Sequence, residues 1–290
     1  MKWFYFLPVV LTSLVFISCQ KEASVENGEK VISASTMIDI AYGADPLQNM
    51  DVYLPAGRSV ATTKVIILVH GGAWIFGDKS DFATFIDTLK QRFPEYAIFN
   101  INYRLSEFPN HVFPTQELDV KAAVDYIYSK RSAYLVGDKF VLLGASAGAH
   151  LSLLQAYKNS SPVKIKVVVD FFGPTNMNDL YDNPGIVTAD NIAAIVGDTP
   201  ANNPAIYQQS SPINFVSAAS ACPTIILQGG TDPLVNTETQ SGALRDKLQT
   251  AGVPVQFVLY PGKGHGDDWD DATFLDAFNK IQAFVNLYNP

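Results

Sequence analysis

The fold is decided by the stretch Phe140-Val141-Leu142-Leu143-Gly144-Ala145-Ser146-Ala147-Gly148-Ala149. Its apolar start predicts a buried strand, and a Gly-x-Ser-x-Gly turn leads from that strand into a predicted helix. A sharp strand-to-helix turn exposes the serine hydroxyl to a base that can take its proton. Gly144 and Gly148 let the backbone crowd at the turn, and Ala147 leaves an amide free to donate. Ser146 is therefore the candidate nucleophile.

Strands and helices alternate on both sides of this stretch. Apolar strands are predicted at residues 64–69, 97–103, 165–172, 223–228 and 255–260. Amphipathic helices are predicted from Ser80, which can act as a cap, from Thr115, from the nucleophile turn to about Lys158, around residues 244–248 and at residues 274–288. This alternation predicts an α/β fold with a mostly parallel sheet and helices on both faces. Residues 37–42 and 49–54 alternate apolar with polar and predict two antiparallel leading strands.

Composition favours one globular domain and disfavours nucleic-acid binding. The chain has 290 residues and a net charge of −8, and it contains no basic cluster that could follow a phosphate backbone. No His-Glu-x-x-His, paired-cysteine or Walker-type spacing occurs, so no metal or nucleotide cofactor is expected.

The N-terminus has the pattern of an export signal. Lys2 precedes an apolar run that ends at Cys19, and Phe16-Ile17-Ser18-Cys19 is similar to a bacterial lipoprotein signal, although Phe16 stands where leucine is usual. We expect removal of residues 1–18, a lipidated Cys19, a polar tether over residues 19–35 and a domain over residues 36–290. The expected location is the bacterial cell envelope, on either the periplasmic or the cell-surface side of the membrane. A plain cleaved signal and an uncleaved anchor are the alternatives.

A second catalytic element is predicted where the buried strand 64–69 ends. The sequence there is His70-Gly71-Gly72-Ala73-Trp74, and backbone amides in such a loop can stabilise a developing oxyanion. The predicted donors are the amides of Gly72, Ala73 and Ala147. A plain glycine turn is the alternative.

The acid and the base of a triad follow in the order Ser, Asp, His. Asp232 comes just after the strand at 223–228, where active sites of parallel sheets are built, and His265 follows the next strand. Asp267 or Asp268 is a less favoured third member.

Three other histidines have different expected roles. His70 belongs to the oxyanion loop and is expected to hold it by hydrogen bonding. His150 lies one helical turn after Ser146, and His111, in a proline-rich connection, is a candidate for facing the substrate.

Residues 173–221 interrupt the alternation with Asn, Asp, Pro and Gly. A connection of this length in a compact domain is typical of a lid or a binding loop, so we expect an excursion over the catalytic face. An irregular surface loop is the alternative.

From about Thr36 to Pro290 the chain resembles α/β-hydrolases of the esterase/lipase kind, and more narrowly the bifunctional feruloyl and acetyl-xylan esterase-like family, BD-FAE. The motifs that carry the resemblance are His70-Gly71-Gly72-Ala73-Trp74 with Gly77-Asp78-Lys79, Asn102-Tyr103-Arg104-Leu105, Phe113-Pro114 with Asp119, and the nucleophile turn. They are also similar to motifs of arylformamidases and of hormone-sensitive-lipase-like carboxylesterases. The resemblance implies a cofactor-free serine esterase with the triad Ser146, Asp232 and His265, and a structural ion pair between Arg104 and Asp119.

The expected substrates are acetyl or feruloyl esters on polysaccharide. The asparagines of the excursion suit sugar hydroxyls better than hydrocarbon; they are Asn176, Asn178, Asn183, Asn191, Asn202 and Asn203. Trp74 could stack on a sugar or feruloyl ring or pack under the loop. A non-catalytic surface lipoprotein that binds a glycan or a partner is the alternative of a different class.

Overall fold

The computed structural model describes residues 25–26, 29–30, 32–159 and 162–290. The predicted signal segment and Cys19 lie outside these residues. Within the expected tether, β1 (Val25–Glu26) pairs with β2 (Glu29–Lys30) in an antiparallel ladder. None of the helices in the described ranges combines the length and the apolar character that crossing a membrane requires.

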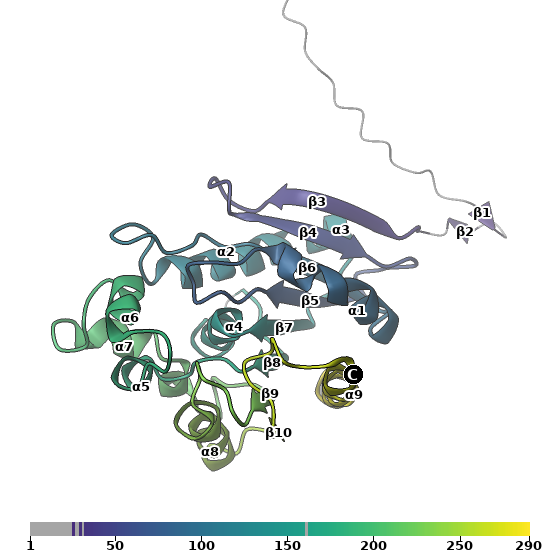
Figure 1. Cartoon of the computed structure of the whole chain (residues 1–290). Coiled ribbons are helices and arrows are strands. Elements are labelled where there is room, and N and C mark those ends of the chain that lie inside the picture. The colour runs from purple at the N-terminus through teal and green to yellow at the C-terminus, as the bar shows by residue number, and fades with distance from the viewer. Residues whose placement is uncertain (1–24, 27–28, 31, 160–161) are drawn as a thin grey trace, which may run out of the picture.

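One eight-stranded sheet organises the domain. Its order is β10-β9-β8-β7-β5-β6-β4-β3, and Figure 1 shows the strands stacked from β3 to β10. The strands are β3 (Ser35–Ala41), β4 (Asn49–Leu54), β5 (Lys64–Val69), β6 (Tyr96–Ile101), β7 (Phe140–Ala145), β8 (Val167–Phe171), β9 (Thr224–Gly229) and β10 (Val255–Tyr260). The β3–β4 and β4–β6 pairs are antiparallel, and all other neighbours are parallel. The prediction of an α/β fold with two antiparallel leading strands is confirmed.

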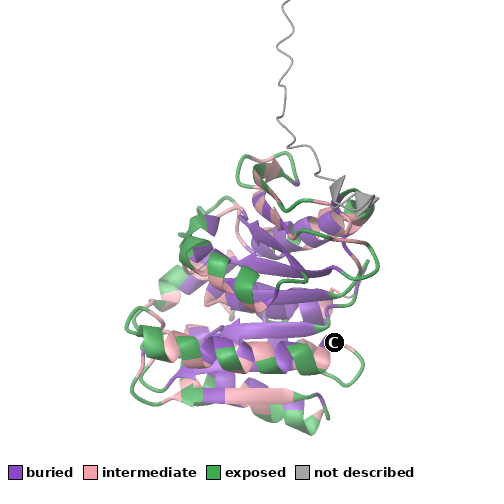
Figure 2. Ribbon diagram, turned by 90° about the vertical axis from the view of Figure 1, so that its right-hand side faces the viewer, coloured by how far each residue is buried: buried purple, intermediate pink, exposed green. Residues whose placement is uncertain are grey.

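Helices cover both faces of the sheet. One face packs against α2 (Thr115–Ser129), α4 (Ala147–Lys158) and α8 (Ala243–Thr250), and the other packs against α1 (Ile86–Arg92) and α9 (Asp271–Tyr288). Figure 2 shows the central strands as a buried layer, with the exposed residues on the outer sides of the helices. Because side chains alternate along a strand, Val65 and Ile67 of β5 face the first core, whereas Ile66 and Leu68 face the second. The remaining helical elements are η1 (Lys79–Phe85), α3 (Arg131–Tyr134), α5 (Met177–Asp182), α6 (Ala189–Val196), α7 (Pro204–Gln209), η2 (Pro212–Phe215) and η3 (Thr237–Gly242).

The helix expected to begin at Ser80 starts differently. A 3-10 segment, η1, precedes α1, and its cap is Asp78, whose carboxylate accepts from the amide of Ser80 at 2.8 Å. The carboxylate of Asp81 in turn accepts from the amide of Asp78 at 3.2 Å, which completes a capping box. A carboxylate satisfies the free amides of a helix start at least as well as a serine hydroxyl, so Asp78 takes the position.

A buried ion pair joins the loop after β6 to α2. Asp119 is buried, and its carboxylate accepts from Arg104 Nε at 2.8 Å and from Arg104 Nη2 at 2.6 Å. The Arg104 amide (2.9 Å) and Gln48 Nε2 (2.7 Å) donate to the same carboxylate. Paired in this way, Asp119 fixes the chain between β6 and α2, which is the structural role that the resemblance implies.

Asp119→Ala is expected to lower the free energy of unfolding by about 3 kcal/mol, because it leaves several donors without their acceptor. The control is Asp125→Ala, which removes the half-exposed pair between Lys121 and Asp125 in the same helix and should cost about 0–1 kcal/mol. Urea unfolding of both variants measures the difference, and equal losses would contradict a structural role for the buried pair.

Candidate active site

The nucleophile turn has the strained backbone that its sequence predicts. Ser146 lies between β7 and α4 with φ 53° and ψ −120°, in a left-handed region that non-glycine residues rarely adopt. Its amide donates to the carbonyl of Phe171 at 2.8 Å, and its carbonyl accepts from the amide of His150 at 3.0 Å. The end of β8 and the first turn of α4 therefore hold the serine in place.

The two glycines of the motif are required by close packing. A Cβ atom on Gly148 would lie 2.0 Å from the carbonyl oxygen of Val69, and one on Gly144 would lie 2.3 Å from that of Gly148. The first turn of α4 thus rests directly on the ends of β5 and β7. Any side chain at these two positions would push Ser146 away from the sheet edge.

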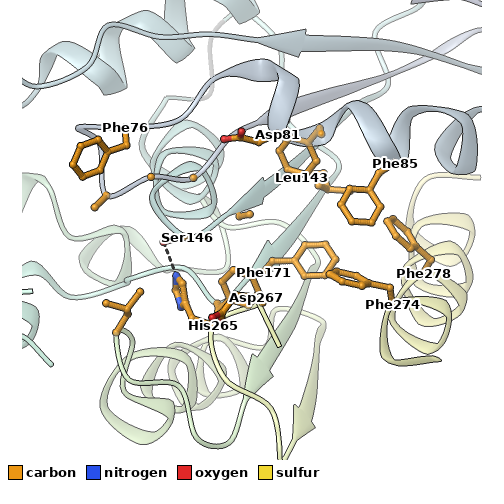
Figure 3. Close-up of a pocket in the computed structure, with 18 of the residues that line it drawn as sticks. Phe76, Asp81, Phe85, Leu143, Ser146, Phe171, His265, Asp267, Phe274 and Phe278 are labelled. Atoms are coloured by element: carbon orange, nitrogen blue, oxygen red, sulfur yellow. Dashed lines mark hydrogen bonds between the residues drawn. The ribbon is translucent and has the colours of Figure 1, made fainter. Parts of the chain in front are cut away.

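Three residues from three loops form one hydrogen-bonded chain. His265 Nε2 lies 2.8 Å from Ser146 Oγ, and His265 Nδ1 lies 2.7 Å from Asp232 Oδ2 (Figure 3 shows the first of these contacts). Asp232 follows β9, and its Oδ1 accepts from the amides of Leu234 (2.8 Å) and Val235 (2.9 Å). The sequence assigned these three residues to a triad, and the structure brings them together.

Asp232 is held as a carboxylate. Burial works to raise its pKa, but the hydrogen bond and the charge of His265 and the two amide donors together lower that pKa below its usual value. The less favoured candidates lie elsewhere: Asp268 accepts from the amide of Gly264 at 2.8 Å, and Asp267 lies at the cavity wall. Asp232 alone reaches Nδ1 of the histidine.

The oxyanion loop carries three successive left-handed residues, Gly72 (φ 100°), Ala73 (φ 50°) and Trp74 (φ 61°). The carbonyl of Gly72 accepts from the amides of Ile75 (3.0 Å) and Phe76 (2.8 Å), which closes a tight turn. Within the described residues, no backbone or side-chain acceptor lies on the amides of Gly72 and Ala73. The amide of Ala147, at the first position of α4, has no partner within its own helix. These are the three amides that the sequence proposes as oxyanion donors.

His70 and Tyr103 support the loop from below. The two rings stack with centroids 4.3 Å apart, and the Tyr103 hydroxyl donates to the carbonyls of His70 (3.0 Å) and Gly71 (3.2 Å). Both side chains are buried, and burial lowers the pKa of His70. His70 Nδ1 also lies 2.8 Å from the carbonyl oxygen of Gly71, so hydrogen bonding and stacking together hold the loop.

Trp74 is not the exposed aromatic platform that its position suggested. Its side chain is 2% exposed, is absent from the cavity wall and packs edge-on against Phe113 and His150. The indole Nε1–H donates to His150 Nδ1 at 3.3 Å. The alternative of packing under the loop is thus the correct one.

His150, which the sequence left without a role, is the partner that Trp74 needs. Its Nε2 lies 2.7 Å from the carbonyl oxygen of Ser210, so this nitrogen carries the proton and Nδ1 is free to accept. Burial lowers the pKa of His150 to about 4, which keeps the ring neutral. A neutral imidazole thereby links the oxyanion loop to the segment 173–221.

The segment 173–221 folds into α5, α6, α7 and η2, and Figure 1 shows α5, α6 and α7 gathered at one side of the domain. It does not line the catalytic cavity. Two of its asparagines serve helix starts: Asn176 caps α5 and Asn203 caps α7. His111, outside the cavity wall as well, gives its carbonyl to Gln116 Nε2 at 2.6 Å. Neither this excursion nor His111 therefore contributes to the wall of the cavity at Ser146, contrary to the expectation that they face the substrate.

A cavity of about 700 Å³ opens at Ser146 and His265 and continues between η1, α1 and α9. Its walls are formed by Gly71, Gly72, Ala73, Phe76, Asp81, Phe82, Phe85, Leu89, Leu143, Ala145, Ser146, Phe171, Phe172, Leu234, His265, Gly266, Asp267, Phe274 and Phe278. Seven of these are phenylalanines, and sequence analysis could not connect them because they come from four separate segments of the chain. In the described part of the chain, no group of three or more His, Cys, Asp or Glu side chains is arranged to hold a metal ion.

Comparison with known proteins agrees with this geometry. Esterase LipC of Mycobacterium tuberculosis is 26% identical over 263 residues, covering 85% of this chain and 64% of LipC. The isoprenylcysteine alpha-carbonyl methylesterase ICME of Arabidopsis thaliana is 28% identical over 246 residues, covering 79% of this chain and 56% of the plant protein. The chain thus spans less than two thirds of the length of either relative.

Among solved structures, a truncated carbohydrate esterase from gut microbiota superimposes with a TM-score of 0.73 at 25% identity. The match covers 91% of this chain and all of the other. The family model of BD-FAE matches residues 50–248, a span that contains the oxyanion loop, Ser146 and Asp232. Because this match covers more than half of the sequence, the chain belongs to the BD-FAE family.

Proposed function

We propose that this protein is a serine ester hydrolase that cleaves carboxylic esters through an acyl-enzyme. The observation that carries the proposal is the chain of hydrogen bonds from Ser146 through His265 to Asp232, next to a loop with free amides. The names of the relatives support it, since LipC is an esterase and ICME a methylesterase.

The geometry supports ester hydrolysis in two stages, acylation of Ser146 and then hydrolysis of the acyl-enzyme. Ser146 Oγ attacks the ester carbonyl while its proton moves to His265 Nε2, 2.8 Å away, and the new oxyanion accepts from the amides of Gly72, Ala73 and Ala147. Collapse breaks the bond to the alcohol oxygen, which takes the proton from Nε2 as it leaves. Water then repeats both steps on the acyl-enzyme and releases the acid. Asp232 stays ionised and stabilises the imidazolium.

The proposed substrates are acetyl or feruloyl esters borne by polysaccharide. Support comes from membership in the BD-FAE family and from the similarity to a carbohydrate esterase. A general carboxylesterase is the second candidate, favoured by the similarity to LipC and ICME, and an arylformamidase-like hydrolase is a variant of it. The intact triad counts against a non-catalytic binding protein.

We also propose that the protein is an envelope lipoprotein held by acyl chains on Cys19. The proposal rests on the signal-like sequence Phe16-Ile17-Ser18-Cys19 after an apolar run.

Ser146→Ala and His265→Ala are each expected to lower kcat by roughly 10⁶-fold, and Asp232→Asn by roughly 10⁴-fold, because the three residues act as a unit. A fluorophosphonate probe should label wild type but not Ser146→Ala. Ser152→Ala is the control, since its hydroxyl only donates to the carbonyl of Gly148 within α4. Labelling that persists without Ser146 would overturn the assignment of the nucleophile.

Trp74→Phe is expected to lower kcat by about 10- to 100-fold and to change KM much less. It removes the hydrogen bond to His150 that fixes the oxyanion loop, and that loop is used mainly in the transition state. His111→Ala, on a residue outside the cavity wall, is the matched control. Steady-state kinetics on a short aryl ester measures both constants, and a change confined to KM would contradict a role for Trp74 in supporting the loop.

Release of acetate or ferulate from acetylated or feruloylated xylan is expected, with the Ser146→Ala variant as the blank. Chromatography of the released acids decides the result. If soluble aryl esters are hydrolysed while neither xylan ester is touched, the general carboxylesterase replaces the polysaccharide esterase.

Full-length protein expressed in a bacterial host is expected to partition with membranes and to carry acyl chains on Cys19, and Cys19→Ser should abolish both properties. Mass spectrometry of the mature N-terminus makes the measurement. A mature protein that begins at another residue would exclude the lipid anchor.

A further inference from the structure

The cavity beside Ser146 has the form of a groove with two unlike ends. Its catalytic end holds Ser146, His265 and the oxyanion loop, and its far end lies between the end of η1 and α9, at Phe85, Phe274 and Phe278. Figure 3 shows these three phenylalanines grouped on the opposite side of the groove from the serine. A ligand bonded to Ser146 Oγ can therefore extend along the face of the sheet.

The walls along this path are apolar. Leu143 and Phe171 form the floor from β7 and β8, and Phe82 and Leu89 come from η1 and α1. The carboxylates in the wall belong to Asp81 and Asp267, and no lysine or arginine contributes to the described wall. Burial of an apolar group along these walls is favourable because it removes apolar surface from water. A carboxylate along the same path would find no lysine or arginine to pair with, and it would lie near the like charges of Asp81 and Asp267.

Ring contacts between η1 and α9 mark the far end. The Phe85 ring lies 5.1 Å from that of Phe274 and 5.5 Å from that of Phe278, measured between centroids. Beyond them, Arg92 Nη1 donates to Asn279 Oδ1 at 2.9 Å and ties α1 to α9. We call Phe85, Phe274 and Phe278 the aromatic stop.

A groove that ends at these rings can accept only one side of an ester. The alcohol leaves with a proton from His265. In a polysaccharide ester the alcohol is part of a polymer, so it has to remain outside the groove. The acyl group stays on Ser146 Oγ until water releases it, and it is small enough to enter.

We propose that the groove is the acyl-binding site and that it selects apolar acyl groups longer than acetyl, up to a length set by the aromatic stop. This proposal rests on the acyl-enzyme function proposed above and specifies its substrate. A two-carbon acyl group would leave most of the 700 Å³ unfilled, whereas an arylalkenoyl or a medium-length alkanoyl group would cover the phenylalanine walls.

The first experiment varies each side of the ester in turn with wild-type protein. For p-nitrophenyl esters, kcat/KM is expected to rise by about fourfold per added methylene until the chain meets the aromatic stop, and then to fall. For acetate esters of increasingly long alcohols, the dependence should be nearly flat. A series that is flat in the acyl chain, or that responds to the alcohol instead, would overturn the proposal.

The second experiment moves the stop. Phe85→Ala and Phe274→Ala should each shift the maximum of the acyl series to longer chains, and Phe274→Leu should shift it less. Leu275→Ala is the matched control, because Leu275 lies on the same helix, is 57% exposed and lies outside the groove wall. A maximum that stays in place in all three phenylalanine variants would exclude the aromatic stop.

Fluorophosphonate labelling of Ser146 separates this proposal from the proposed function. If the protein is labelled and hydrolyses acetyl esters but its kcat/KM does not depend on acyl length, the serine esterase function is supported and the acyl-binding groove is excluded. Protein that is neither labelled nor active on any ester loses both.

Discussion

The close approach of α4 to the end of β5 is the constraint on which the site depends. Gly148 lies so near the carbonyl of Val69 that no Cβ atom fits between them, and Gly144 meets the same turn from below. This contact brings the first turn of a helix, with its unpaired amides, to the edge of the sheet where β5 passes into the oxyanion loop. Ser146 has a left-handed backbone at this point, where the chain passes directly from strand to helix. Nucleophile and oxyanion donors are thus placed by one packing contact.

The fold and the triad could be predicted because their signals are local. A short apolar run such as Lys64–Val69 predicts a central strand that is buried on both faces. The Gly-x-Ser-x-Gly motif between a strand and a helix predicts a sharp turn with the serine exposed. Asp232 and His265 follow successive parallel strands, and the carboxyl ends of such strands meet at one edge. Chain order and strand polarity therefore suffice to bring residues 33 positions apart within 2.7 Å.

The remainder depends on contacts between distant segments that periodicity does not encode. Trp74 was open to either exposure or burial, and it is buried because His150, 76 positions away, offers an acceptor inside the core. The asparagines of residues 173–221 suggested sugar recognition, yet an asparagine that caps a short helix has the same sequence appearance as one that binds a hydroxyl. The groove itself is visible only once η1, α1 and α9 lie on the same face of the sheet.

The position of α9 has a consequence for how this molecule can change over evolutionary time. The helix supplies one wall of the groove through Phe274 and Phe278, but it holds none of the triad and lies beyond residues 50–248, which define the family match. Single substitutions can therefore accumulate on the inner face of α9 while the strand ends that carry Ser146 and Asp232 remain unchanged. Substitutions on this face of α9 can therefore change the shape of the groove without altering Ser146 or Asp232.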